Sequence, residues 1–352
     1  MQQRKVVVLG AGGLVSQRLQ QRLAAHPWFT LSAVVGSQRF IGQPLASVPW
    51  ILDEPRPSLP DLVVGDVACR STMEQLVREG VTLAFSALPS EQARTLEPAW
   101  AEAGVSVFSN ASAYRGQAGI PLVVPEINPS ELEMLAGVDG GKHVCATNCT
   151  LLPLVMPLAA LHERFGLVRY TMRSEQGLSG GGHPYMVEAI AQGSVDPNIP
   201  GEAEKTAAEC RHILSWNGEE NVRCARVMRA NGHHVFVEAT FELPLTLEHA
   251  QDCLEAWSEA HQLESLPSSP HRPLVMVPAI DPMTHLFADG ERFDPDPNPS
   301  LDLKAGMAIV VGGLTCTASH TLRFEGYSHN TIRGAAGGVV YLAELAVSKH
   351  LV

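Results

Sequence analysis

Short apolar runs alternate with longer amphipathic segments in the first part of the chain. Helical spacing of the apolar residues predicts helices over Leu14–Ala24, Thr72–Arg78 and Glu91–Ala103. The apolar runs predict strands at Lys5–Leu9, Leu31–Val35, Val81–Phe85 and Val105–Phe108, with less regular candidates at Leu122–Val124 and His143–Ala146. This alternation predicts a mostly parallel sheet with helices on both faces.

The second part of the chain follows a different pattern. It predicts helices at Leu151–Phe165, Glu202–Leu214, Thr246–Leu263 and Gly334–His350, and strands at Val168–Arg173, Arg223–Arg229, Val235–Leu243, Ala308–Val311 and His320–Glu325. Arg223–Arg229 and Val235–Leu243 flank the turn dipeptide Asn231-Gly232, which predicts an antiparallel pair. Leu266–Pro273 and Asp294–Pro299 are proline-rich and predict surface loops.

Length and composition narrow the class of protein. The chain has 352 residues, more than the roughly 250–300 at which single cores stop growing, so we expect two domains. A net charge of -12 argues against nucleic acid or an anionic membrane as the main partner. Seven cysteines without a CxxC pair, and no histidine or carboxylate cluster at ligand spacing, predict neither a zinc site nor a disulfide framework. The apolar run near the N-terminus is too short for a signal peptide, which favours the cytoplasm.

A glycine-rich turn follows the first predicted strand. Gly10-Ala11-Gly12-Gly13-Leu14-Val15-Ser16 places three glycines where the chain turns into a helix. Glycine allows the backbone to approach a pyrophosphate, and the helix N-terminus offers unpaired N–H groups. The position between a strand and a helix predicts a dinucleotide site that includes Gly10, Gly12, Gly13, Leu14 and Val15.

The end of the second predicted strand favours NADP as the dinucleotide. An acidic residue there would bind the ribose 2′-hydroxyl of NAD. The chain has Ser37 and Arg39 at this place, and a hydroxyl with a guanidinium suits a 2′-phosphate.

A candidate nucleophile precedes the apolar helix that begins the second part. Cys149 stands at the N-terminus of this helix, where the helix dipole is expected to lower the thiol pKa. His233 is of the type that serves a nucleophilic cysteine as acid–base partner. Gln176 places an amide beside a glycine-rich loop, and Glu202 and Lys205 share one face of a helix.

Six motifs, in order along nearly the whole chain, resemble aspartate-semialdehyde dehydrogenases. They are Ser86-Ala87-Leu88-Pro89-Ser90, Ser109-Asn110-Ala111-Ser112-Ala113-Tyr114-Arg115, Val123-Val124-Pro125-Glu126-Ile127-Asn128, Thr147-Asn148-Cys149-Thr150, Leu178-Ser179-Gly180-Gly181-Gly182 and Asn330-Thr331-Ile332-Arg333-Gly334-Ala335-Ala336-Gly337-Gly338. The resemblance is to the archaeal and fungal branch, which includes malonyl-CoA reductases. The chain departs from the family pattern in Ala146-Thr147-Asn148-Cys149, where the family often has Asn-Pro-Asn-Cys and the proline is missing, at Ser16 in place of a third glycine, and at His183 in place of an aromatic residue.

The resemblance implies a role for each matching residue. Cys149 is implied as the nucleophile, His233 as the acid–base residue and Gln176 as the active-site amide. The other implied contacts are Arg226 to the substrate carboxylate, Glu202 to its ammonium, Asn148 to substrate, Arg115 and Lys205 to phosphate, and Ser86, Ser179, Gly180, Gly181 and Asn330 to the cofactor.

The fold class implied is α/β, with an N-terminal Rossmann-type doubly wound domain and an α+β catalytic and dimerisation domain. Residues 1–147 plus 331–352 are assigned to NADP binding, with the C-terminal helix returning to the first domain, and residues 148–330 to catalysis and dimerisation. The resemblance implies a homodimer or homotetramer.

The implied activity is the reversible, NADP-dependent conversion of L-4-aspartyl phosphate to L-aspartate 4-semialdehyde through a cysteine thioester. The alternatives are a malonyl-CoA reductase, an N-acetyl-gamma-glutamyl-phosphate reductase and, in another class, a non-catalytic NADP-binding sensor. Glu202 disfavours the first two, because neither substrate has a free ammonium group to bind.

Several residues near these motifs are predicted to have structural roles. His234 should point away from His233 and serve packing or the surface. Cys145 is predicted to be a small core residue, and Glu204 and Glu209 to lie on a solvated helix face. Arg229 suits phosphate binding and a surface position equally.

Overall fold

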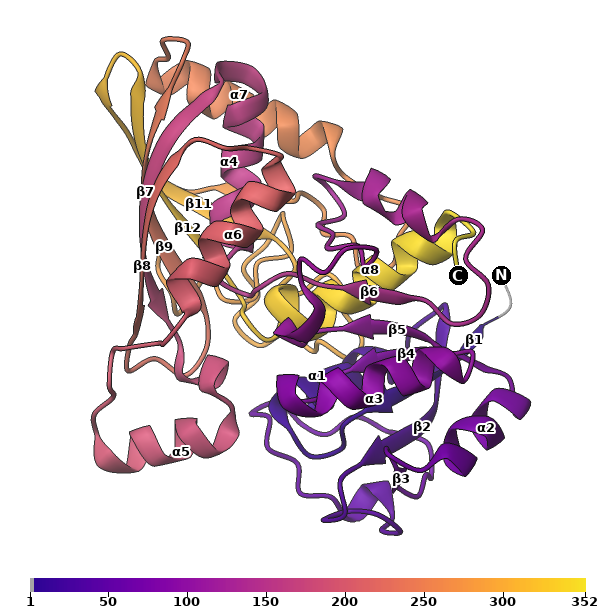
Figure 1. Ribbon diagram of the computed structural model, residues 1–352. Helices are drawn as coiled ribbons and strands as arrows, with labels where there is room; N and C mark the ends of the chain where they lie inside the picture. The colour runs from indigo at the N-terminus through magenta and orange to yellow at the C-terminus, as the bar shows by residue number, and fades with distance from the viewer. Residues whose placement is uncertain (1–2) are drawn as a thin grey trace.

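The computed structural model describes residues 3–352 as two six-stranded sheets with helices packed against them (Figure 1). The first sheet contains β1 (Arg4–Leu9), β2 (Phe29–Gly36), β3 (Gly65–Asp66), β4 (Val81–Ser86), β5 (Ser106–Ser109) and β6 (His143–Cys145). The second contains β7 (Leu167–Gln176), β8 (Glu219–Arg226), β9 (His233–Phe241), β10 (Leu274–Met276), β11 (Ile309–Ala318) and β12 (Thr321–Ser328). The α-helices are α1 (Leu14–Leu23), α2 (Arg70–Arg78), α3 (Ser90–Glu102), α4 (Leu152–Phe165), α5 (His183–Gln192), α6 (Glu202–Leu214), α7 (Leu247–Ala260) and α8 (Gly337–Ser348).

The first sheet has the strand order β3-β2-β1-β4-β5-β6, and its neighbouring strands are parallel. This is the order of a doubly wound dinucleotide-binding fold, whose ligand lies beyond the carboxyl ends of the strands. The order reverses at β1, so the glycine-rich turn after β1 stands at the switch point.

Alternate residues of β1 point into two different cores. Val6 and Val8 pack with α1 and α8, whereas Val7 and Leu9 pack with α2 and α3. A strand that is covered on both faces is apolar at consecutive positions, and this is the pattern that predicted it. The predicted α/β fold with a parallel Rossmann-type sheet is therefore confirmed.

The C-terminal helix returns to the first sheet. Helix α8 contacts α1 and β5, and the C-terminus ends beside the N-terminal half of the chain (Figure 1). These contacts support the predicted assignment of residues 331–352 to the cofactor domain; the boundary itself stays a prediction.

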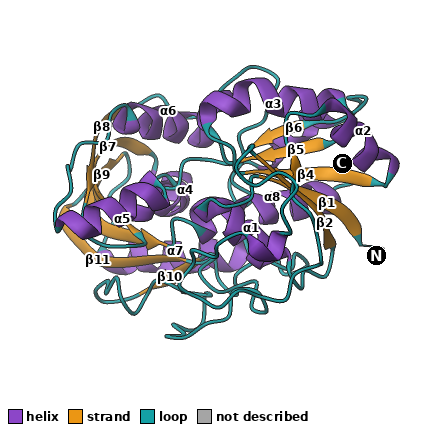
Figure 2. Ribbon diagram, turned by 90° about the horizontal axis from the view of Figure 1, so that it is seen from below, coloured by secondary structure: helices purple, strands orange, loops and turns teal. Residues whose placement is uncertain are grey.

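The second sheet is mixed, with the order β10-β11-β12-β9-β7-β8. Helices α4, α6 and α7 pack on it, and α4 lies at the centre in contact with β7, β9, β11 and β12. In both views these helices occupy the side of the sheet that faces the first domain (Figures 1 and 2). Apart from its last residues, α4 is buried on all sides, because the sheet and its neighbouring helices enclose it.

One predicted strand pairing is wrong. The segments predicted as Arg223–Arg229 and Val235–Leu243 form β8 and β9, but β7 lies between them, parallel to β8 and antiparallel to β9. Alternation of apolar and polar residues identifies a strand, but it does not identify the neighbour, which tertiary packing decides. Leu122–Val124 forms a single bridge to Cys145 rather than a strand.

Among the α-helices and strands, three were not predicted, namely β3, α5 and β10. Two of them are strands of two or three residues, too short to show a period.

Within residues 3–352, no helix has the length and apolarity that crossing a membrane requires.

Candidate active site

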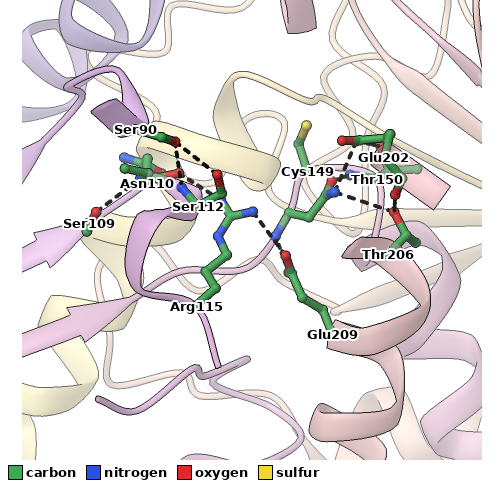
Figure 3. A network of polar contacts seen from close by, with 12 residues as sticks. Ser90, Ser109, Asn110, Ser112, Arg115, Cys149, Thr150, Glu202, Thr206 and Glu209 are labelled. Atoms are coloured by element: carbon green, nitrogen blue, oxygen red, sulfur yellow. Dashed lines mark hydrogen bonds and ion pairs between the residues drawn. The ribbon is translucent and has the colours of Figure 1, made fainter. Parts of the chain in front are cut away.

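Cys149 lies in a turn just before α4, at the junction of the two domains. The Asn148 side-chain oxygen accepts a hydrogen bond from the Thr150 N–H at 2.7 Å, and the Leu151 N–H donates to the Asn148 carbonyl at 3.1 Å. These bonds fix the backbone on both sides of Cys149 before the helix begins. The thiol points away from the network that holds its neighbours (Figure 3).

The predicted acid–base partner lies directly beside the thiol. His233 Nε2 is 3.3 Å from Cys149 Sγ, although 84 positions separate the two residues in the chain. His233 is the first residue of β9 and is completely buried. The predicted proximity of this thiol and imidazole is confirmed.

Three predicted site residues form one row across the second sheet. Gln176, the last residue of β7, is paired with Arg226 of β8 on one side and with His233 of β9 on the other. Residues directly opposite each other on adjacent strands point to the same face. The sheet therefore presents a guanidinium, an amide and an imidazole together at one edge.

Burial keeps both reacting groups neutral. Desolvation, together with the charge of Glu202, raises the pKa of the Cys149 thiol to about 12 against the opposing charges of Arg115 and Arg226. Desolvation also lowers the pKa of His233 to about 3. The predicted lowering of the thiol pKa by the helix dipole is wrong for this structure, because desolvation of the surrounded thiol exceeds the effect of the partial charges at a helix end.

The second ring nitrogen of His233, Nδ1, lies against the backbone of the glycine loop. Nδ1 accepts a hydrogen bond from the Gly177 N–H at 3.2 Å. A backbone hydrogen bond with Gly232 raises the pKa of His233 and opposes the effect of desolvation. When Nδ1 accepts from Gly177, the proton of the neutral ring is on Nε2; Nε2 takes a proton from the thiol only in the other tautomer, in which Nδ1 carries the ring proton.

Arg226 is anchored by backbone and covered by a loop that requires glycine. Its Nη1 donates to the Gly177 carbonyl at 2.8 Å. A Cβ on Gly180 would lie 2.6 Å from this Nη1 and 3.2 Å from His233 Nε2. A side chain at position 180 would therefore displace the Arg226 guanidinium and press on His233.

Helix α6 brings Glu202 to the same site. Its Oε1 accepts from Asn148 Nδ2 at 3.0 Å and from Thr150 Oγ1 at 3.2 Å (Figure 3). No hydrogen bond from the described part of the chain reaches its Oε2. One oxygen of this carboxylate is therefore fixed, and the other remains available to a cationic group.

The two predicted phosphate ligands are not in contact with each other. Arg115 is mostly buried, and its Nη2 donates to the Asn110 carbonyl at 2.7 Å. Lys205 is exposed in the first turn of α6 and forms no ion pair with another residue of the range 3–352. Their shared role in phosphate binding stays a prediction.

The structural predictions for nearby residues have mixed outcomes. His234 is packed against Phe236 and paired with Glu325, and Cys145 is a buried core residue, as predicted. Glu204 is exposed, as predicted. Arg229 is partly buried and donates to backbone carbonyls at residues 175, 231 and 232, so it braces the loops beside His233.

The prediction for Glu209 is wrong. This side chain is buried, and it binds both Arg115 and the backbone of Asn148. The position of Glu209 in the site could have been predicted from its spacing. It follows Glu202 by seven residues, which places both side chains on the same face of α6.

Gly334 is a residue that sequence reasoning did not assign to the site. It lies in a π-helical turn, Ile332–Ala336, at the start of the terminal helix, where a continuous helix from Gly334 was predicted. A Cβ on Gly334 would stand 2.6 Å from Cys149 Cβ and 2.9 Å from its Cα. Such turns inside helices are frequent at functional sites, and here the turn supports the backbone that carries the thiol.

We expect Gly334→Ala to displace Cys149, since neither clashing atom is the end of a flexible side chain. A shift of this kind should lower kcat/KM about 100-fold and destabilise the fold by about 1–3 kcal/mol. Steady-state kinetics and denaturant unfolding measure the two effects. Activity above half of the wild-type value would show that the close contact has no role.

A cavity with a volume of about 600 Å³ lies at the carboxyl ends of the first sheet. Its lining includes the predicted residues Gly10, Gly12, Gly13, Leu14, Ser37 and Arg39. Gly10 has a φ of +120°, and a Cβ there would lie 2.4 Å from Ser16 Oγ, so this turn needs glycine. No side chain caps the N-terminus of α1, which leaves its N–H groups for a ligand.

These features fit a dinucleotide. The turn requires glycine, the helix end is uncapped, and a guanidinium stands where a 2′-phosphate would lie. The same cavity is lined by His183 and Pro184 at the start of α5, so the second domain closes its far side. Of the cofactor residues predicted in the first domain, Val15 and Ser86 do not line it: Val15 is half-buried, and Ser86 is buried, with its carbonyl accepting from Asn110.

The remaining predicted cofactor contacts lie near His233. Asn330 is buried; its Nδ2 donates to Ser179 Oγ at 2.9 Å, and its Oδ1 accepts from the Gly232 N–H at 2.7 Å. Ser179 belongs to the short 3-10 turn Leu178–Gly181. Asn330 therefore ties the glycine loop to the residue before His233.

Comparison with known proteins identifies related dehydrogenases and a related reductase. Residues 5–135 match the family described as semialdehyde dehydrogenase, NAD binding domain. The chain is 34% identical to an aspartate-semialdehyde dehydrogenase of Archaeoglobus fulgidus, with 99% of each chain covered, and 33% identical to that of Aspergillus fumigatus, with 98% of each covered. It is 28% identical to a malonyl CoA reductase (NADP) of Metallosphaera sedula, with 98% of this chain and 97% of that protein covered.

A solved structure shares the whole architecture. The aspartate semialdehyde dehydrogenase of Candida albicans, solved with NADP, has a TM-score of 0.80 and 26% identity, and all of each chain is covered.

Proposed function

Because the chain belongs to the aspartate-semialdehyde dehydrogenase family, we propose that it carries out the reaction for which the family is named. The enzyme reversibly converts L-4-aspartyl phosphate to L-aspartate 4-semialdehyde with NADPH, releasing phosphate. This step serves the biosynthesis of lysine, threonine and methionine. The contact of 3.3 Å between Cys149 Sγ and His233 Nε2 is the observation that carries the proposal.

In the direction of aldehyde oxidation, Cys149 Sγ bonds to the aldehyde carbon, and the thiol proton passes to Nε2 of His233 in the tautomer that carries its ring proton on Nδ1. This transfer needs a neutral imidazole, which burial provides by lowering the pKa of His233 to about 3. The aldehyde oxygen takes that proton and returns it to His233 when the carbonyl re-forms. Bound NADP supplies the acceptor for the hydride that leaves the same carbon.

The second half of the reaction restores the thiol. The acyl group is now a thioester on Cys149. Arg115 and Lys205 bind the incoming phosphate, which attacks the thioester carbon and breaks the bond to sulfur. The leaving thiolate recovers its proton from His233, so the pair returns to its neutral state.

Arg226 and Glu202 orient the amino acid part of the substrate. Arg226 binds the α-carboxylate, and the free Oε2 of Glu202 receives the ammonium group. Their opposite effects on the Cys149 pKa indicate that both charges lie close to the thiol. Gln176, between Arg226 and His233, contributes an amide to the same pocket.

A malonyl-CoA reductase is the alternative that the relatives raise. It would use the same thiol and the same cofactor, but its substrate has no ammonium group and no phosphate leaving group. The available Glu202 oxygen and the basic pair Arg115 and Lys205 favour the aspartyl substrate. Homo-oligomeric assembly stays a prediction of the family resemblance.

A direct assay separates the two activities. NADP reduction is measured with aspartate semialdehyde or with malonate semialdehyde, with and without phosphate. We expect phosphate-dependent reduction with aspartate semialdehyde at a kcat/KM at least about 100-fold higher, since one buried charged contact is worth about 3 kcal/mol. A preference for malonate semialdehyde with coenzyme A as acceptor would overturn the assignment.

We expect Arg226→Lys to raise the KM for aspartate semialdehyde about 10- to 100-fold, because lysine lacks the planar fork that binds a carboxylate with two hydrogen bonds. The kcat should change little. Arg223→Lys is the matched control, since Arg223 is exposed and lies on the same strand with its side chain toward the other face. Equal KM values in the two variants would remove Arg226 from the substrate site.

A further inference from the structure

Three residues on one face of α6 hold Asn148, the residue before the nucleophile. Glu202, Thr206 and Glu209 are spaced by four and three residues, so their side chains lie along one stripe of the helix. The Asn148 side-chain nitrogen donates to Glu202 at 3.0 Å and to Thr206 Oγ1 at 3.4 Å, and the Asn148 backbone N–H donates to Glu209 Oε2 at 2.6 Å. The position of the Cys149 turn thus depends on α6.

Glu209 also reaches the other domain. Its Oε1 accepts from Arg115 Nη1 at 3.1 Å, and Arg115 Nη2 donates to the Asn110 carbonyl just beyond β5 (Figure 3). The Glu209 side chain is 8% exposed and that of Arg115 12% exposed, so water screens this pair weakly. A single carboxylate therefore joins the first domain to the turn that carries the nucleophile.

Arg115 retains binding capacity after these contacts. A guanidinium has five N–H groups, and Glu209 and Asn110 use two of them. Its Nε is buried and has no partner in the described part of the chain. The carboxylate of Glu209 thus fixes the orientation of Arg115 without neutralising its ability to bind an anion.

We propose that Glu209 is a positioning residue that couples the phosphate site to the nucleophile: one oxygen orients Arg115 and the other fixes the Asn148–Cys149 backbone. The inference rests on the proposed function, because it takes Arg115 as a phosphate ligand. It implies that Glu209 serves both half-reactions, formation of the thioester and its cleavage by phosphate, whereas Arg115 acts mainly in the second.

Glu209→Gln tests the inference because the amide has nearly the same size but cannot make both contacts. If its oxygen accepts from Asn148, its NH2 group faces Arg115, donor against donor; the flipped amide loses the other bond. Glu204→Gln is the matched control, since Glu204 lies on the same helix and is exposed. Glu209→Asp, which keeps the charge one methylene shorter, provides a second variant if the first folds poorly.

Two rates are measured for each variant. The first is the burst of NADPH from aspartate semialdehyde without phosphate, and the second is the rate of turnover as phosphate is added. We expect Glu209→Gln to slow the burst about 10-fold and to raise the KM for phosphate about 10- to 100-fold. Arg115→Lys should raise the KM for phosphate by a similar factor but slow the burst less than Glu209→Gln does. The double variant should be no more than about 3-fold worse in KM for phosphate than the worse single variant, as expected for coupled residues.

The possible failures are distinguishable. Absence of phosphate-dependent turnover in the wild type would refute the proposed function itself. Normal wild-type turnover with Glu209→Gln and Glu209→Asp both equal to Glu204→Gln would refute the positioning role alone. If the KM for phosphate of the double variant rises by the product of the two single increases, the two residues act independently. That result would also refute the positioning role.

Discussion

Cys149→Ser is expected to abolish turnover, with kcat falling about 10⁴-fold or more, the order of loss seen when a covalent nucleophile is removed. A hydroxyl beside His233 is a far weaker nucleophile than a thiol, and it would form an ester rather than a thioester. The cavity at the glycine-rich turn is formed by other residues, so NADPH should bind with unchanged affinity. Steady-state kinetics and fluorescence titration of NADPH measure the two quantities.

Cys69→Ser is the control for this substitution. Cys69 is also a free, partly exposed cysteine, but it lies at the start of α2, outside the site. Its replacement should leave kcat within about 2-fold, as surface substitutions usually do. Turnover by Cys149→Ser within 10-fold of the wild type would exclude covalent catalysis by this sulfur.

His233→Gln should lower kcat about 10²- to 10⁴-fold, which is the contribution of a positioned acid–base group. Glutamine has similar volume, but it cannot take the thiol proton. His234→Gln is the matched control: it is the next residue of β9, points to the other face and is paired with Glu325. Equal losses in both variants would show that disturbance of the strand, rather than proton transfer, is responsible.

His233 also contributes to the pH dependence of stability. Its pKa is lowered from 6.5 to about 3 in the folded protein, so the unfolded chain binds a proton between these values and the folded chain does not. The stability it contributes is complete above pH 6.5 and is lost as the pH falls toward 3. His233→Gln should therefore flatten part of the acid limb of the unfolding free energy. Part of the acid dependence of the unfolding free energy should remain in this variant, because burial also lowers the pKa of His329.

The first domain could be predicted almost completely from the sequence. Consecutive apolar residues such as Val6–Leu9 are what a strand covered on both faces requires, and Gly10 follows where the turn needs a positive φ. For the second sheet, most of the strands could be predicted, but their order and pairing could not. Its central pairing joins β7 to β8 and β9, and nothing in the alternation of β8 indicates which strand lies beside it.

The site was predictable where a residue type carries its own chemistry. Cys149, His233, Arg226 and Glu202 were identified from chemistry and family resemblance, and the structure brings them together. The electrostatic state was not predictable, because the thiol pKa depends on how much protein surrounds the sulfur after folding. Gly334 was missed for a related reason: its role is the space that it leaves for Cys149.

The central claim is that Cys149 carries the acyl group during turnover. The most direct test mixes the enzyme with aspartate semialdehyde and NADP in the absence of phosphate, stops the reaction with acid, and maps any adduct by peptide mass spectrometry. We predict about one equivalent of NADPH per subunit and an acyl adduct on Cys149 that hydroxylamine or phosphate removes. NADPH formation without an adduct on Cys149, or with the adduct on another residue, would contradict the account.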